Sequence, residues 1–346
     1  MRIKEIDAAR GFTVLIMPAV HVLMINSSPS TQASLLGKTF GFLAEGPGAQ
    51  LFMLLMGMSF TLSRRKSLRD TLIKVFLLLC AAYSLNVLKF DVPILTGTMP
   101  QSFLNDHQIE NNANGMMKLF LLGDILHLAA FALIVLRLIY PLSKYHIWAM
   151  LFAFVIIFIS PVRLNDVPKN PLVKYFSDLL FANDVYVYFP VFPWLCYPLI
   201  GLGLGYYLNT IKNFFVICSY AGITLMITGK LLCISGFTLS CDNFYKTGAG
   251  GTLYHLGLVL LWLYLVHLAV KHLPSNRFFN LLEWLSRNIT AVYIIQWICV
   301  FWMIGLGGYH RLGIMSSIIY ICFISIFVFG FVYAIQQLSH VNKYFK

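Results

Sequence analysis

Residues 7–25 read DAARGFTVLIMPAVHVLMI, an almost wholly apolar run that opens on Asp7 and Arg10 and carries His21 deep inside. About 20 consecutive apolar residues suffice for a helix that crosses the hydrocarbon core of a bilayer. An ionisable side chain at that depth is costly and is more often functional than not. The stretch therefore predicts a membrane helix in which His21 takes part in chemistry.

The spacing between Arg10 and His21 places both side chains on one face of this helix. At 100° and 1.5 Å per residue, their separation amounts to three full turns plus about 20°, and about 16.5 Å along the axis. Pro18 removes a backbone donor, so we expect a bend before His21. The alternative for His21 is a helix-packing hydrogen bond, and for Asp7 an interfacial pair with Arg10 is the favoured interpretation.

The composition predicts an all-α, polytopic integral membrane protein. Of 346 residues, 59% are hydrophobic and only 11% are charged, against about 25% charged in soluble domains. The net charge of +12 therefore reflects basic residues that collect on the cytoplasmic side of the bilayer, and we expect no nucleic-acid partner.

The hydrophobic segments predict about ten membrane helices within a single domain that covers residues 1–346. Placing both termini in the cytoplasm puts most Lys and Arg residues on that side and most acids on the other. We expect the plasma membrane of a prokaryote, because the chain shows no appended luminal domain or sorting tail. The segments are about 10–27, 42–62, 71–88, 118–140, 146–160, 189–208, 213–234, 252–272, 285–305 and 313–338.

The seven cysteines include no CxxC pair, and no HExxH pattern occurs, so we expect no metal. Most of the cysteines lie in apolar runs, where this residue acts as a small hydrophobe. Cys233 and Cys241 flank a predicted outer loop and could pair if that side is oxidising, but their spacing alone leaves the pairing open.

Five segments, taken in order, carry a resemblance to known proteins. They are IDAARGFTVLIMPAVH with Arg10-x10-His21, GPGAQLFMLLMGMSFTLSRRKS, GDILHLAAFALI, FPVFPWLCYPLIGLGLG and LEWLSRNITAVYIIQW. Together they resemble the transmembrane acyltransferases, including the acyltransferase-three branch, and are most similar to the heparan-alpha-glucosaminide N-acetyltransferase catalytic-domain family. Gln296 is a departure, since that branch often carries histidine there.

The resemblance implies transfer of an acyl group, usually acetyl, from cytoplasmic acyl-coenzyme A to an amine or hydroxyl of an extracytoplasmic sugar. His21 would meet both substrates, either as general base or as an acylated nucleophile. The phosphates of coenzyme A need cationic partners, which Arg10 and the cluster Arg64, Arg65 and Arg69 would supply. For the cluster, an ordinary positive-inside flank is the alternative.

Several other residues are candidates on the predicted outer side. Glu45 would orient His21 or bind the acceptor, unless it is an ordinary interfacial acid. Asp124 would polarise the acceptor, although a structural hydrogen bond with His127, three residues on, explains it as well. Asp184 and Trp194 would contact the sugar, but tryptophan is expected at a membrane boundary in any case.

Two rival classes stay open. In a proton-coupled transporter or flippase of a glycan or lipid-linked substrate, His21 and Asp124 would relay protons, but the matched pair of broken helices typical of such proteins is not evident. A non-catalytic scaffold fits poorly with a polar residue deep in the first helix. The acceptor, the acyl chain length and the oligomeric state, a homodimer included, are not readable from the sequence.

Overall fold

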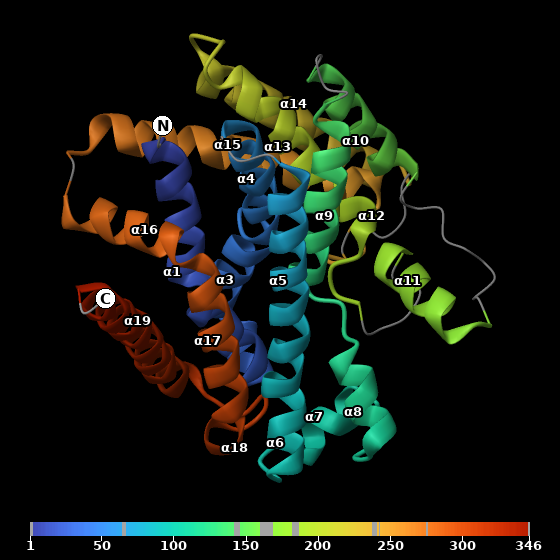
Figure 1. The fold of residues 1–346 in the computed structure, drawn as a ribbon, viewed down its shortest axis with the longest axis vertical. Helices are drawn as coiled ribbons and strands as arrows, with labels where there is room; N and C mark the ends of the chain where they lie inside the picture. Colours follow the sequence, from blue (N-terminus) through green and yellow to red (C-terminus); the bar gives the residue numbers. More distant parts are fainter. Residues whose placement is uncertain are drawn as a thin grey trace. The chain divides into compact units, whose positions relative to one another are not determined.

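The chain is helical almost throughout, with 80% helix and no strands in the part that the structure describes, which confirms the all-α prediction. It divides into two compact units, formed by residues 1–6, 45–83 and 121–274 and by residues 7–44, 84–120 and 275–346. Figure 1 labels the helices of both units. The single domain expected from the sequence stays a prediction. The computed structural model describes residues 3–63, 67–141, 146–159, 169–181, 187–236, 241, 243–274 and 276–344.

The first unit is built on two closely packed helix pairs, α4 with α13 and α14 with α15, and α10 lies against α13. Its sequence explains the arrangement, because these helices are apolar on nearly every face and find partners on more than one side. The helices of this unit are α4 (Ala49–Leu62), α5 (Leu68–Asn86), α9 (Ile125–Ile139), α10 (Ile147–Ile159), α11 (Pro171–Phe181), α12 (Val191–Trp194), α13 (Cys196–Tyr207), α14 (Phe214–Ile234) and α15 (Ala249–His272).

Helices α4 and α13 approach each other so closely that the contact requires glycine on both sides. A Cβ atom at Gly57 would lie 2.0 Å from the carbonyl oxygen of Pro198, and one at Gly201 would lie 2.0 Å from that of Leu54. Both distances are far inside van der Waals contact with rigid backbone. Small residues allow this close approach in membrane proteins, where backbone packing holds helices together.

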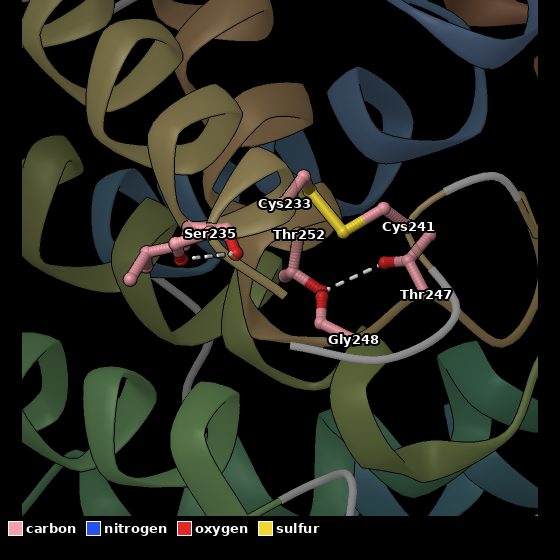
Figure 2. Close-up of a disulfide and its surroundings, with 7 residues drawn as sticks. Cys233, Ser235, Cys241, Thr247, Gly248 and Thr252 are labelled. Carbon is pink, nitrogen blue, oxygen red and sulfur yellow. Dashed lines mark hydrogen bonds between the residues drawn. A yellow bond between two sulfur atoms is a disulfide. The ribbon is translucent and has the colours of Figure 1, made fainter. Parts of the chain in front are cut away.

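A disulfide closes the connection between α14 and α15 (Figure 2). Cys233 in the last turn of α14 is bonded to Cys241, with the two Cα atoms 6.0 Å apart. Thr247 and Thr252 share a hydrogen bond of 2.9 Å between their hydroxyl groups at the start of α15. The pairing that the spacing left open is therefore formed, and it ties the end of α14 to the loop that leads to α15.

The second unit is organised around α1, which runs unbroken through Pro18. The two residues that follow α1 are held by α19 and by the segment before it. The Asn26 side-chain amide donates to the carbonyl of Gly308 at 3.1 Å, and the hydroxyls of Ser27 and Ser317 lie 2.6 Å apart. The helices of this unit are α1 (Lys4–Ile25), α2 (Pro29–Gln32), α3 (Leu35–Glu45), the π-helical turn η1 (Val87–Asp91), α6 (Val92–Leu95), α7 (Gln101–Asp106), α8 (Ala113–Phe120), α16 (Arg277–Arg287), α17 (Ile289–Trp302), α18 (Ile304–Gly307) and α19 (Ile314–Tyr344).

Five helical segments are long and apolar enough to cross a membrane, which supports an integral membrane protein. Three further apolar helices are shorter, with 10–17 residues. The ten spans and the cytoplasmic termini therefore stay predictions. The five segments are Lys4–Ile25, Leu68–Leu95, Phe214–Ile234, Ala249–His272 and Ile314–Leu338.

The predicted helix over residues 42–62 is wrong as a continuous element. A turn at residues 46–48 ends α3 at Glu45 and starts α4 at Ala49. The sequence Gly-Pro-Gly explains the break, because glycine disfavours a helix interior and proline removes a backbone donor.

We expect Gly201→Ala to lower the thermal stability of the protein in detergent. The added methyl group overlaps the Leu54 carbonyl, and overpacking of this kind costs about 1–3 kcal/mol. Gly330→Ala in α19 is the matched control, since nothing lies within 4 Å of its Cβ position. A Gly201→Ala protein that unfolds at the same temperature as wild type would contradict the close α4–α13 contact.

The disulfide predicts how many thiols react with a maleimide after denaturation. Without reductant, five of the seven cysteines should react, because five are free. Prior reduction should expose all seven, and Cys233→Ser should add one reactive thiol to the unreduced count by releasing Cys241. Mass spectrometry gives the counts, and seven labels without reductant would rule the bond out.

Candidate functional site

His21 lies on α1 and is held by two consecutive residues of α17, all within the second unit. Its Nδ1 atom is 2.6 Å from Nε2 of Gln296, and its ring stacks on the indole of Trp297 with centroids 3.8 Å apart and planes 25° from parallel. Gln296 is fully buried and Trp297 is 8% exposed. The hydrogen bond and the stacking together fix the position and the orientation of the imidazole.

Gln296 sets which ring nitrogen of His21 carries the proton. If its NH2 group donates to Nδ1, the proton is on Nε2; if its carbonyl accepts from Nδ1–H, then Nε2 holds the lone pair and can act as a base. Gln296 Oε1 is buried without a hydrogen-bond partner among the described residues. A half-turn of the amide therefore lets Gln296 pair with either tautomer without breaking another hydrogen bond to Oε1.

Asp7 and Arg10 also lie on α1, in the same unit as His21. The hydroxyl of Ser286 donates to Asp7 Oδ1 at 2.8 Å, which ties α1 to α16. Arg10 is half-buried, and because α1 is one continuous helix, its side chain leaves the helix on the same face as His21, about 16.5 Å away along the axis.

Asp124 and Trp194 lie in the first unit, near Tyr245. The indole Nε1 of Trp194 donates to the backbone carbonyl of Tyr245 at 2.9 Å. The pKa of Tyr245 is raised by burial, and further by Tyr188, Asp124 and Glu45. We call these residues the Tyr245 cluster: Glu45, Asp124, Tyr188, Trp194 and Tyr245.

Asp124 caps α9 rather than lying inside a helix, so the predicted start of the 118–140 helix is wrong. Its Oδ1 accepts from the backbone amide of Ile125 at 2.7 Å, and its own amide donates to His127 Nδ1 at 3.2 Å. This reciprocal cap satisfies backbone donors that a helix start leaves unpaired, and it favours the structural interpretation of the Asp124–His127 pair.

Glu45 ends α3, and Gln50 connects it to the half-buried His255. The Gln50 side-chain amide donates to the Glu45 carbonyl at 2.8 Å and lies 3.2 Å from Nδ1 of His255. Burial raises the pKa of the Glu45 carboxyl, because it disfavours the charged form. Gln50 and His255 were not singled out from the sequence, because only the fold brings their helices together.

The remaining predicted residues are exposed or lie outside the description. Arg69 is exposed at the start of α5. Arg64, Arg65 and Asp184 lie outside the described residues. Among the residues that the structure does describe, no group of three or more His, Cys, Asp or Glu side chains is arranged to hold a metal ion.

Lys89 is a buried residue beside Trp297 that the sequence analysis missed. Its Nζ atom lies 4.9 Å from the centre of the Trp297 ring, on which His21 also stacks. The predicted helix over 71–88 ended seven residues too early, so Lys89 fell in a predicted loop. The segment Leu68–Leu95 in fact continues as helix, and depth in a span is the signal that would have identified this cation.

These observations describe an integral membrane protein with a histidine fixed among polar and aromatic partners, a class in which acyltransferases are one member. Comparison with known families gives the assignment: the family described as heparan-alpha-glucosaminide N-acetyltransferase, catalytic, matches residues 2–236. The chain belongs to this family of membrane acetyltransferases. No curated protein and no solved structure matches the chain.

The matched region includes His21, Arg10 and Lys89, whereas Gln296 and Trp297 lie beyond it. The family therefore accounts for the helix that carries the imidazole, and the partners that hold the ring come from the part of the chain outside the match.

We expect Gln296→Leu to lower kcat for acetyl transfer about 10–100-fold, because the His21 ring loses the partner that orients it. Gln296→Glu, which can still accept from Nδ1–H, should retain more activity than the leucine variant. Steady-state kinetics of both variants, with the KM for the acetyl donor measured separately, makes the comparison.

Gln336→Leu is the matched control for loss of an interhelical glutamine. Gln336 accepts from Trp284 Nε1 at 2.8 Å and donates to Asn288, also within the second unit. If kcat falls equally in Gln296→Leu and Gln336→Leu, Gln296 acts through packing alone.

Proposed function

We propose that this protein transfers an acetyl group from cytoplasmic acetyl-coenzyme A to an amine or hydroxyl of a sugar on the other side of the membrane. The observation that carries the proposal is the family match over residues 2–236. It is supported by the fixed imidazole of His21, since acyl transfer requires a group that can take a proton from the attacking amine or hydroxyl.

In the reaction that we propose, the acceptor nitrogen or oxygen attacks the thioester carbonyl while His21 Nε2 takes its proton. The C–S bond then breaks, and the thiolate of coenzyme A recovers that proton from His21. Gln296 supports the first step when its carbonyl accepts from Nδ1–H, because Nε2 then carries the lone pair. The alternative, in which Nε2 is acetylated first, uses the same ring orientation.

Arg10 is the residue that we propose for the phosphates of the donor. A guanidinium forms paired hydrogen bonds with phosphate oxygens, and the helix separation of about 16.5 Å from His21 suits an extended pantetheine arm between the two. Arg64, Arg65 and Arg69 are proposed to extend this cationic surface at the cytoplasmic face.

The acidic and aromatic residues are proposed to act on the acceptor. Asp124 and Glu45 would attract an amino sugar, and Trp194 with Asp184 would supply an aromatic face and a carboxylate. The buried indole of Trp194, which donates to Tyr245, supports a structural role for this residue first, so it is the weakest member of the proposed set.

The test is acetyl transfer by purified protein in lipid nanodiscs, with acetyl-coenzyme A as donor and glucosamine or a glucosamine-terminated oligosaccharide as acceptor. We expect wild type to transfer the acetyl group and the rate of transfer to fall at least about 100-fold in His21→Ala, because the general base role and the nucleophilic role both need the imidazole. Donor binding should survive in His21→Ala.

A protein that binds the donor but never acetylates either acceptor would contradict the proposal. Proton-coupled uptake of a glycan or lipid-linked substrate into proteoliposomes, abolished in the same variant, would then favour the transporter interpretation. Rapid quenching before acceptor is added separates the two acetylation routes, because only the nucleophilic route leaves an acetylated protein.

A further inference from the structure

The turn that follows α5 places a cation inside the protein. Residues Val87–Asp91 form the π-helical turn η1, and α6 follows directly. Figure 1 labels the flanking helices α5 and α6. Lys89 is 2% exposed, although it lies in the apolar segment Leu68–Leu95. A π-turn is uncommon within a helix and recurs at functional sites, and an ionisable side chain within a membrane span is functional more often than not.

Aromatic rings surround the ammonium group of Lys89. Its Nζ atom lies 4.5 Å from the ring centre of Phe90, 4.9 Å from that of Trp297 and 6.0 Å from that of Phe301. The faces of aromatic rings attract cations, Trp most strongly. These ring contacts favour the charged form of the ammonium group and help to fix its location.

The same indole links Lys89 to His21. Trp297 stacks on the imidazole with centroids 3.8 Å apart, and its face also receives the ammonium of Lys89. The indole Nε1–H is buried and has no hydrogen-bond partner among the described residues. A proton acceptor, a cation and an available N–H donor are therefore built around one tryptophan.

Acyl transfer creates charge that such a cation can stabilise. When a nucleophile adds to a thioester carbonyl, the electron pair of the C=O bond moves to oxygen and leaves a full negative charge there. A fixed positive group in a medium of low dielectric constant stabilises that charge far more than water would. A base alone provides no such stabilisation, so a His21 site needs a second element.

We propose that Lys89 is a catalytic residue that stabilises the oxyanion formed on the thioester carbonyl, with Trp297 Nε1–H as a second donor. This rests on the proposed function. The acceptor nitrogen bonds to the carbonyl carbon, and His21 receives the acceptor proton as the oxyanion forms beside Lys89. The C=O bond then re-forms, the C–S bond breaks, and the proton passes from His21 to the thiolate. Lys89 keeps its own proton throughout.

Lys89→Met tests the proposal, because methionine preserves the length of the side chain and removes the charge. We expect kcat to fall about 10²–10³-fold, the loss typical of a removed oxyanion donor, with little change in the KM for acetyl-coenzyme A. The kcat of Lys89→Arg should lie between that of wild type and that of Lys89→Met. Lys118→Met in α8, an exposed position of the same unit, is the matched control.

A binding measurement makes the test independent of turnover. Trifluoroacetonyl-coenzyme A, a ketone whose hydrate mimics the tetrahedral adduct, should bind wild type more tightly than acetyl-coenzyme A does. Lys89→Met should lose most of this preference while binding acetyl-coenzyme A normally. An unchanged preference would overturn the proposal.

Other outcomes point elsewhere. If Lys89→Met raises the KM for glucosamine 6-sulfate and leaves the KM for glucosamine unchanged, Lys89 binds acidic acceptors, and the oxyanion role is wrong. If Lys89→Met and Lys89→Gln both fail to fold, the role is structural and the proposal is wrong. A wild type that transfers no acetyl group overturns the proposed function itself, whereas an active wild type with an equally active Lys89→Met overturns only the role of Lys89.

Discussion

The contact between His21 and α17 is the constraint on which the second unit depends. An imidazole within an apolar helix must find a hydrogen-bond partner, because an unsatisfied polar group in hydrocarbon costs several kcal/mol. Gln296 meets that need at one ring nitrogen, and Trp297 covers one face of the ring. Two neighbouring residues of one helix thus stabilise the imidazole and orient the ring that we propose to be reactive.

The partner of His21 is the neutral amide of Gln296, and this affects which tautomers of the ring can be accommodated. A carboxylate beside the ring would hold one tautomer, whereas an amide can present either its carbonyl or its NH2 group. A proton carrier that accepts from one substrate and returns the proton to another benefits from such a partner. The resemblance leads one to expect histidine here, and the glutamine keeps the hydrogen bond while removing a second titrating group from the site.

Local patterns predicted most helices and placed His21 within the first of them, because apolar length is readable one segment at a time, whereas the catalytic role of His21 stays a prediction. The break at Gly-Pro-Gly and the cap at Asp124 shifted helix boundaries, since short-range hydrogen bonds compete with hydrophobic pattern. Lys89 was missed because a π-turn prolongs a helix that seemed complete at residue 88. The stacking of His21 on Trp297 joins residues 276 positions apart, and no local pattern marks such a contact.

The bond between Cys233 and Cys241 distinguishes the two ends of the α14–α15 pair. Disulfides form and persist in oxidising compartments and are rare in a reducing cytosol. The end of the pair that carries the bond is therefore expected to face an oxidising compartment, which is the outer side in the predicted topology. Basic charge does not distinguish the ends, because Lys230 and Lys246 lie near the disulfide while Lys212 and Lys271 lie at the opposite end. For this helix pair the covalent bond is thus a sharper indicator of sidedness than the distribution of lysines.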